Sequence, residues 1–218
     1  MTRIELAAWE QKFRAKVAEI PAADHAHDVE HVQRVVRNAE QLASAEGARL
    51  DVVIPAAWLH DLVTAPKTGS ERSLASRRSA REAQKFLQEI DYPANLLPAI
   101  VHAIEAHSFS ANIKPDTIEA KVVQDADRLE ALGAIGIARV FVSGAMLGQQ
   151  FYDPNDPFAE GRSLDEQKFT IDHVEMKPFK IAKTLHTEAA RAEGQTRTAF
   201  MRDFLRELRH EIWTARSD

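Results

Sequence analysis

Residues 51–61 read Asp-Val-Val-Ile-Pro-Ala-Ala-Trp-Leu-His-Asp. The apolar run in this stretch predicts a buried helix, and the adjacent pair His60-Asp61 stands at its polar end. Imidazole and carboxylate groups are both ligands of divalent metal ions. Two consecutive ligands on one helix can bind the same ion only if it lies against that helix and other segments complete its coordination. The stretch therefore predicts a helical fold in which distant segments meet at His60-Asp61.

His31 and Asp127 are the candidate residues that complete this coordination, and each lies on a different expected helix. Two imidazoles and two carboxylates form a mixed nitrogen and oxygen set that leaves positions for water or a substrate oxygen. Such a set suits Mn²⁺, Fe²⁺, Co²⁺, Ni²⁺ or Mg²⁺, and Zn²⁺ also accepts it. Each residue alone has an ordinary explanation as a core histidine, a surface histidine or a helix cap. The inference therefore depends on the ordered set.

The composition limits the classes of function. With 218 residues, 44% of them hydrophobic and 28% charged, the chain has the balance of a globular protein. The formal net charge of -5 argues against polymeric nucleic acid or an anionic membrane as partner, but a bound divalent ion would allow an anionic substrate. The absence of cysteine excludes disulfides, thiolate zinc sites and iron–sulfur clusters. Because we find neither a membrane-spanning run nor a signal peptide, we expect a cytoplasmic protein, and self-association stays open.

Apolar residues recur at spacings of three and four, which predicts one all-α domain over residues 1–218. The metal-binding core is expected over about residues 24–141, and a helical extension over about 165–215. Helices are expected to start at caps such as Asp24 or Asp28, Ser76 and Thr117. The expected helices cover about residues 6–20, 24 or 28 to 47, 51–63, 76–90, 93–104, 117–129, 165–192 and 195–215. The helix that starts at residue 117 could also continue to residue 141.

Two other segments have weaker patterns. Residues 148–165 contain Asp153-Pro154-Asn155-Asp156-Pro157 and form the expected long loop, either a lid over the substrate or a disordered segment. Residues 139–142 are a weak strand candidate. The predicted architecture is therefore a helical bundle around a metal site.

Three stretches of this chain resemble the HD-domain phosphohydrolases, and most closely their uncharacterised bacterial single-domain branch. They are His27-Asp-Val-Glu-His31-Val-Gln-Arg-Val, Trp58-Leu-His-Asp61, and Gln124-Asp-Ala-Asp-Arg-Leu-Glu-Ala-Leu-Gly-Ala-Ile-Gly136. The likeness runs from about residue 27 to residue 141. It implies a helical fold around one or two metal ions and hydrolysis of phosphate esters, often in nucleotides. It also implies that four residues bind the metal, namely His31, His60, Asp61 and Asp127.

Candidate substrate-binding residues follow the His60-Asp61 pair. Lys67 and Arg72 lie nearest to it among the cations of that stretch and resemble family positions. A cation beside a metal site can bind phosphate, although a solvated basic loop explains the same residues. Arg34 and Arg128 are interpreted as structural.

Two further histidines could add to the site. His107 continues an inward helix face, so it could bind a second ion or act as an acid toward the leaving oxygen. His102 is the weaker candidate, because five residues place it about 140° away around the helix. Asp125 lies on nearly the opposite face from Asp127 and is interpreted as structural. Asp172-His173 resembles a family segment in part, which leaves its role open.

Competing interpretations differ in class. His27 to His31 also matches the H-x-x-E-H motif of inverted zinc proteases, with Glu30 as base and Glu105 as a third ligand. That interpretation leaves His60-Asp61 unexplained. A non-catalytic module that binds nucleotides or a partner would be expected to lose ligands, and a di-iron oxygenase on the same fold would need more histidines.

The sequence thus predicts a metal-dependent phosphohydrolase that uses metal-activated water on a nucleotide or small phosphoester. The divalent ion would be held by His31, His60, Asp61 and Asp127, and its identity stays open. Asp61 would also orient the attacking water, and His107 is the candidate for an additional catalytic group. Lys67 and Arg72 would neutralise the phosphate. No polymeric nucleic acid and no membrane are expected as partners.

Overall fold

The computed structural model describes residues 3–20, 29–63 and 73–214. The described residues are all-α, as predicted, and the one β-contact among them is an isolated parallel bridge between Gln150 and Phe169. The chain divides into two compact units. Unit 1 contains Met1–Asp127 and His186–Ala190, and unit 2 contains Arg128–Leu185 and Arg191–Asp218. The predicted limits of a core and an extension stay a prediction.

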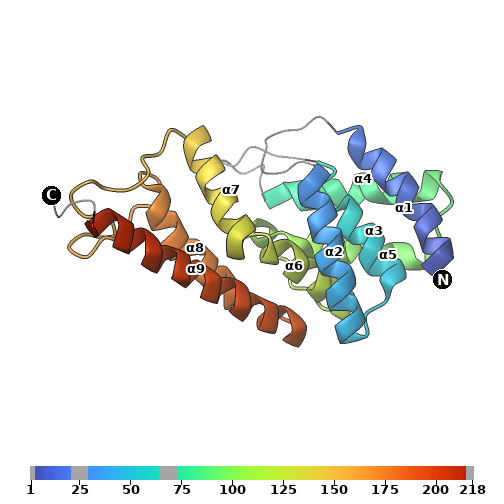
Figure 1. Cartoon of the computed structure of the whole chain (residues 1–218). Helices are drawn as coiled ribbons and strands as arrows, with labels where there is room; N and C mark the ends of the chain where they lie inside the picture. The colour runs from blue at the N-terminus through green and yellow to red at the C-terminus, as the bar shows by residue number, and fades with distance from the viewer. Residues whose placement is uncertain (1–2, 21–28, 64–72, 215–218) are drawn as a thin grey trace. The chain divides into compact units, whose positions relative to one another are not determined.

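Figure 1 labels the helices along the chain. Their bounds are α1 (Arg3–Ala18), α2 (Val29–Glu46), α3 (Leu50–Leu59), α4 (Ala75–Glu89), η2 (Ala94–Leu96), α5 (Leu97–His107), η3 (Phe109–Ala111), α6 (Ile118–Leu129), α7 (Gly133–Met146), α8 (Thr170–Ala182) and α9 (Glu188–Thr214). The candidate caps Asp24 and Asp28 lie outside the described residues. Thr117 is confirmed as the start of α6, because its hydroxyl accepts the backbone N–H of Ala120.

Helix α3 forms the centre of unit 1. All its residues from Val52 to Leu59 are buried, and it packs against α1, α2, α4 and α5 (Figure 1). Pro55 has no N–H to donate to the carbonyl of Asp51, four residues earlier. The buried hydroxyl of Tyr92 donates to that carbonyl at 2.7 Å instead. A proline is therefore accommodated inside the central helix.

The end of α3 differs from the prediction, and the difference decides the geometry of the site. The helix was expected to continue to Val63 but ends at Leu59, with His60 as its C-cap. His60 Nδ1 bonds the carbonyl of Ala57 at 2.8 Å, so the side chain takes a carbonyl that would otherwise serve the next helical turn. The N–H of Val63 donates to Ser79 Oγ on α4. His60 and Asp61 therefore lie in the turn after α3.

Helix α6 does not continue to residue 141. Gly133 has a φ of +70°, which glycine adopts without strain, and a new helix begins there. A Cβ on Gly136 would lie 2.3 Å from the carbonyl oxygen of Ala131, so only glycine permits this turn. The strand predicted at residues 139–142 is wrong, because these residues lie inside α7.

The last two helices break at a different place than predicted. The expected break near residues 192–195 is wrong, and α9 runs unbroken through Gly194. The chain turns instead at residues 183–187, where Thr187 accepts the N–H of Ala190 at the start of α9. Unit 2 packs α7 against α8, and Phe141 on α7 meets Phe204 on α9. Among the described helices none is long and apolar enough by itself to cross a membrane; only α6 and α7 taken together across their break meet the test of length and composition.

Candidate metal centre

Five side chains from four segments of unit 1 converge at one place. His31 lies on α2, His60 and Asp61 in the turn after α3, His107 at the end of α5, and Asp127 on α6. Their potential ligand atoms form two groups, in each of which the atoms lie within 4.8 Å of one another. The first group is His31, His60 and Asp127, and the second is His60, Asp61 and His107. We call these five residues the His/Asp cluster.

The distances within the cluster are those of groups that face a common point. His31 Nε2 lies 3.5 Å from Asp127 Oδ1, and His60 Nε2 lies 3.5 Å from Asp61 Oδ2. His107 Nε2 lies 3.5 Å from the other oxygen of Asp61, Oδ1. The ring of His60 meets the ring of His31 at 5.7 Å and that of His107 at 4.9 Å, edge to face in both cases. His60 is therefore the member common to both groups.

Two histidines of the cluster are oriented in the same way by the ends of their helices. His60 Nδ1 bonds the carbonyl of Ala57, and His107 Nδ1 bonds the carbonyl of Ile104 at 2.6 Å. A carbonyl only accepts, so each Nδ1 carries the hydrogen and Nε2 of the neutral ring presents its lone pair. Metal-binding histidines are commonly oriented in this manner. The helix ends thus aim the two Nε2 atoms into the cluster.

The cluster fits a divalent cation. His60 is fully buried, and its Nε2 atom has no hydrogen-bond partner among the described residues. A buried polar atom of this kind costs free energy unless something binds it. His31 is also buried, whereas Asp61 and Asp127 are 29% and 30% exposed and leave an approach for ligands. Nitrogen and carboxylate donors together suit the metals considered above.

Burial and neighbouring charges set the protonation of the cluster. Burial would raise the pKa of Asp61 and Asp127, but the adjacent histidines hold both well below the ordinary range of a carboxyl group. Burial lowers the pKa of His60 more than Asp61 raises it. For His107, burial would lower the pKa, but the hydrogen bond to Asp61 and its charge raise it. The cluster therefore offers two carboxylates and a neutral His60 to a cation.

The other predicted residues have varied positions. Lys67 and Arg72 lie outside the described residues. The prediction that Ser76 caps a helix is wrong. Ser76 lies inside α4, and its buried hydroxyl donates to the carbonyl of Glu105. His102 is not among the clustered residues. Its Nε2 accepts the N–H of Asp116 instead. Arg128 donates to the carbonyl of Thr184, in keeping with a structural role.

Asp125 is structural, as predicted. Its buried carboxylate accepts the N–H of His186 at 3.0 Å and the N–H and hydroxyl of Thr187 at 2.8 and 2.9 Å. Sequence reasoning missed Gln124, whose amide donates to the carbonyl of Ala106 beside His107 and contacts His186. Both residues fasten the start of α9 within unit 1. Only contacts between residues far apart in the chain identify them.

Asp172 and His173 lie in unit 2, outside the cluster. The fully buried Asp172 accepts both terminal nitrogens of Arg162, at 2.5 and 3.0 Å, and the N–H of Asp165 at 2.7 Å. We call Arg162 and Asp172 the loop anchor, because they tie the 148–165 loop to α8. The loop is thus ordered by hydrogen bonds, and its role as a lid stays a prediction. His173 pairs with Glu166 at 3.1 Å.

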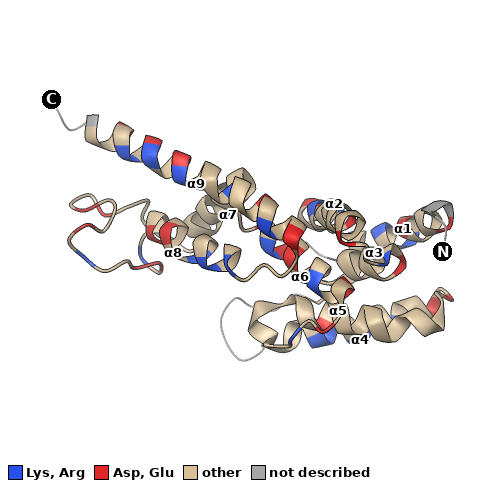
Figure 2. Ribbon diagram, turned by 90° about the horizontal axis from the view of Figure 1, so that it is seen from below, with Lys and Arg blue, Asp and Glu red and all other residues tan. Residues whose placement is uncertain are grey.

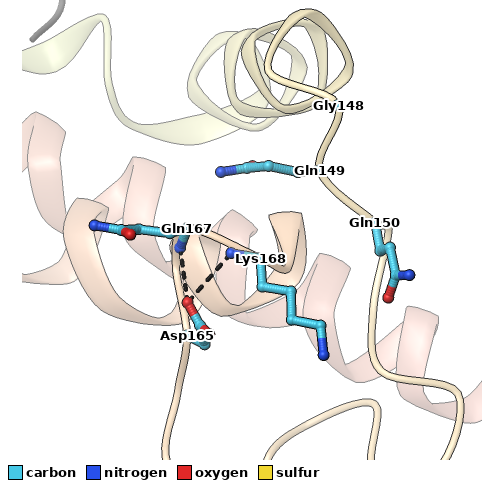
Figure 3. Close-up of a pocket in the computed structure, with 6 residues that line it drawn as sticks. All are labelled: Gly148, Gln149, Gln150, Asp165, Gln167 and Lys168. Carbon is cyan, nitrogen blue, oxygen red and sulfur yellow. Dashed lines mark hydrogen bonds between the residues drawn. The ribbon is translucent and has the colours of Figure 1, made fainter.

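A hollow of about 440 Å³ lies beside this loop (Figure 3). It is lined by Gly148, Gln149, Gln150, Asp165, Gln167 and Lys168. Figure 3 shows Asp165 accepting the N–H groups of Gln167 and Lys168, so its carboxylate organises the turn before α8. The hollow belongs to unit 2 and shares no residue with the His/Asp cluster.

Comparison with known proteins gives one consistent family. The HD domain model matches residues 28–132, a range that includes every member of the cluster. Bacillus subtilis YpgQ, an uncharacterized protein, is 32% identical over 190 residues, which cover 85% of this chain and 84% of YpgQ.

Solved structures agree along nearly the whole chain. A Lactobacillus plantarum protein is 32% identical with a TM-score of 0.70, covering 99% of both chains. YpgQ in complex with ADP is 28% identical with a TM-score of 0.71, covering 93% of this chain and 97% of its own. An HD-superfamily hydrolase from Bacillus thuringiensis is 28% identical with a TM-score of 0.70, covering 94% and 98%. By its sequence and its fold, this chain belongs to the HD domain superfamily of hydrolases.

Proposed function

We propose that this protein is a metal-dependent phosphohydrolase that uses water to cleave a phosphoester of a nucleotide or of a small phosphorylated metabolite. The observation that carries the proposal is the His/Asp cluster, in which the buried Nε2 of His60 lies among two carboxylates and two further imidazoles. Such a donor set is suited to a divalent ion and leaves positions for substrate oxygen. Membership of a hydrolase superfamily supports the same chemistry.

His31, His60, Asp61 and Asp127 would hold the ion. A divalent ion bound there polarises a phosphoryl oxygen and lowers the pKa of a coordinated water. Asp61 has one oxygen toward His60 and the other toward His107, so it can ligate through one oxygen and orient the attacking water through the other. When protonated, His107 would carry a hydrogen at Nε2, 3.5 Å from Asp61 Oδ1, and could donate it to the departing oxygen.

A nucleotide is the preferred substrate class. The relative YpgQ has been crystallised with ADP, and that structure matches this chain over 93% of its length. Lys67 and Arg72 would neutralise the phosphate groups. If Lys67 mainly binds ground-state phosphate, Lys67→Ala should raise KM more than it lowers kcat. An unchanged KM would remove Lys67 from substrate binding.

The proposal is tested by measuring phosphate release from a panel of nucleotides and phosphoesters with Mg²⁺, Mn²⁺, Co²⁺ and Ni²⁺. Asp61→Ala should abolish metal binding and turnover while the helical circular dichroism signal is kept. Asp116→Ala is the matched control, because Asp116 is an exposed aspartate of unit 1 outside the cluster. The control should keep both metal and activity. Equal turnover by wild type and Asp61→Ala would remove the cluster from the mechanism.

A di-iron oxygenase is the second candidate, and one observation favours it. The cluster brings His107 together with the four predicted ligands, so it holds more potential ligands than the predicted single-ion set. Metal analysis would show two iron atoms per chain for the oxygenase, and turnover would require oxygen. Phosphate release with one ion per chain and no oxygen dependence supports the hydrolase instead. No turnover of either kind would favour a module that only binds nucleotides.

A further inference from the structure

Helix α7 has a solvent face of unusual composition. Every exposed residue of this helix is apolar, namely Ala134, Ile135, Ala138, Val142, Ala145 and Met146. Three of these are large, with exposed fractions of 38% for Ile135, 42% for Val142 and 55% for Met146. At 100° per residue the six side chains fall within an arc of about 120°. A helix face of this kind normally carries charged or polar residues.

The opposite side of α7 is already used inside unit 2. Gly133, Gly136, Ile137 and Gly144 are buried there. Arg139 lies at the edge of the apolar arc and donates to the carbonyl of Glu130. By contrast, α9 carries charged residues of both signs along its length (Figure 2). Helix α9 also exposes Phe200 and Trp213, but these stand among its charged residues, whereas the exposed residues of α7 are all apolar. We call this apolar side of the helix the α7 face.

The order of small and large residues on the α7 face is complementary to itself. In an antiparallel pair of α7 helices centred on residue 140, Ala138 would lie at the same height along the helix axis as Val142 of the other copy. We call two positions at the same height a level. Ile135 then shares a level with Ala145, and Ala134 with Met146. Each level of the pair would contain one alanine and one large side chain, which is the alternation that lets facing layers interdigitate. All six exposed residues of α7 obey this rule.

The area agrees with an interface between protein chains. Together with the exposed Phe151, whose ring contacts Phe141 of α7, the α7 face presents on the order of 400 Å² of apolar surface, within the range of the largest patch on a monomer. A standard interface takes about 800 Å² from each partner, with an apolar centre and a polar rim. The α7 face supplies such a centre.

We propose that the α7 face binds the α7 face of a second copy of this chain, antiparallel, around a two-fold axis at the level of residue 140. Two-fold symmetry is the commonest arrangement of homo-oligomers and requires a self-complementary patch. A membrane surface fits less well, because interfacial helices carry Lys and Arg beside their apolar face, and the exposed residues of α7 include neither. The proposal does not depend on the enzymatic activity.

The mass in solution gives the first test. Light scattering of the full chain should give twice 24.4 kDa. Val142→Glu should raise the dimer dissociation constant at least about tenfold, because each dimer would bury two carboxylates. Ala192→Glu is the control: it adds the same charge to an exposed alanine of α9 and should leave the dimer unchanged. Circular dichroism checks that each variant keeps its helices.

A pair of compensating changes tests the proposed levels. Ala138→Val should weaken the dimer, because it places two large side chains at each central level. The double variant Ala138→Val with Val142→Ala restores one small and one large residue there and should recover wild-type association. Failure of the double variant to recover would contradict the proposed register.

Cysteine cross-linking tests the same geometry directly, because the chain has no cysteine of its own. A mixture of Ala138→Cys and Val142→Cys chains should form a disulfide between chains under mild oxidation, since the two positions share a level. A mixture of Ala134→Cys and Ala138→Cys should not, because these levels differ by about 12 Å. A monomeric wild type at 100 μM, a monomer that floats with lipid vesicles, or cross-linking without regard to level would each overturn the proposal.

Discussion

The His/Asp cluster of unit 1 and the loop anchor of unit 2 are both made of buried polar side chains, but they differ in how their atoms are satisfied. In the loop anchor, Asp172 accepts three N–H groups, and Arg162 also donates to the carbonyl of Asp156. In the cluster, the ion-pair distances are 3.5 Å, and His60 Nε2 has no hydrogen-bond partner among the described residues. The donors and acceptors of the loop anchor are satisfied within the protein, whereas the cluster leaves the buried Nε2 of His60 without a hydrogen bond among the described residues.

The difference suggests a way to tell structural from functional carboxylates. A carboxylate saturated by internal donors stabilises the fold, and its removal orphans those donors. A carboxylate that faces other ligand atoms without saturating them contributes little to the fold until a cation arrives. Unit 1 contains both kinds within one helix, since Asp125 and Asp127 lie two residues apart on α6.

Asp127→Ala should therefore impair mainly metal binding, and Asp125→Ala mainly stability. The loss of metal binding in Asp127→Ala is the largest effect we expect. Asp127→Ala should lower metal affinity and turnover at least about 100-fold, because it removes a ligand. Without metal, Asp127→Ala should lower the free energy of unfolding less than Asp125→Ala does, because the Asp127 side chain is 30% exposed and its removal orphans no backbone N–H group among the described residues. Asp125→Ala should lower that free energy by about 3 kcal/mol, because it orphans the donors of His186 and Thr187.

Metal content by mass spectrometry and urea unfolding with a chelator separate the two outcomes. A large loss of stability in Asp127→Ala without metal would mean that the cluster is a structural centre. Retention of full metal content by that variant would remove Asp127 from the ligand set.

The loop anchor gives the second prediction. Arg162→Ala should lower the free energy of unfolding by about 3 kcal/mol, because it leaves the buried Asp172 charge without its ion-pair partner. Arg206→Ala is the control, because Arg206 and Asp203 form an exposed pair worth at most about 1 kcal/mol. Urea unfolding measures both, and metal content should be unchanged in both. Equal losses for the two variants would contradict the structural role of the loop anchor.

The sequence predicted most of this architecture because the apolar periodicity of each helix is a local property. The buried face of α2 and the uninterrupted apolar run of α3 specify helices without reference to the rest of the chain. The ordered set from His31 to Asp127 likewise appeared in the sequence, and the structure brings all four residues and His107 together. Helix type and candidate ligands were therefore accessible to sequence reasoning.

The errors share a different cause. The end of α3 depends on a side-chain contact of His60, and the break before α9 depends on Asp125, which is 61 residues away from His186. Ser76 looked like a local cap, but its hydroxyl serves a carbonyl of α5. Contacts of this kind, like those of Gln124, arise only from tertiary packing, so single-residue propensities did not predict them.

The smallest expected effect is a pH dependence that belongs to unit 2 alone. Burial, followed by Lys177, lowers the pKa of His173 more than Glu166 raises it. In the unfolded chain His173 takes up a proton near its ordinary pKa of 6.5, whereas the folded protein resists it. Because the unfolded state then binds more protons, the contribution of His173 to stability is present above that pH and lost as the pH falls below it. His173→Gln should lack this dependence.

Urea unfolding of wild type and His173→Gln between about pH 8 and pH 5.5 measures the effect as a difference between the two proteins. The difference should be constant at the upper end and should decline, to the disadvantage of wild type, below about pH 6.5. The same decline is expected with Mn²⁺ present, because any stabilisation by metal at the His/Asp cluster is common to both proteins and cancels. A difference that changes when Mn²⁺ is added would show that metal binding at the His/Asp cluster affects the protonation of His173. It would contradict the assignment of this pH dependence to unit 2 alone.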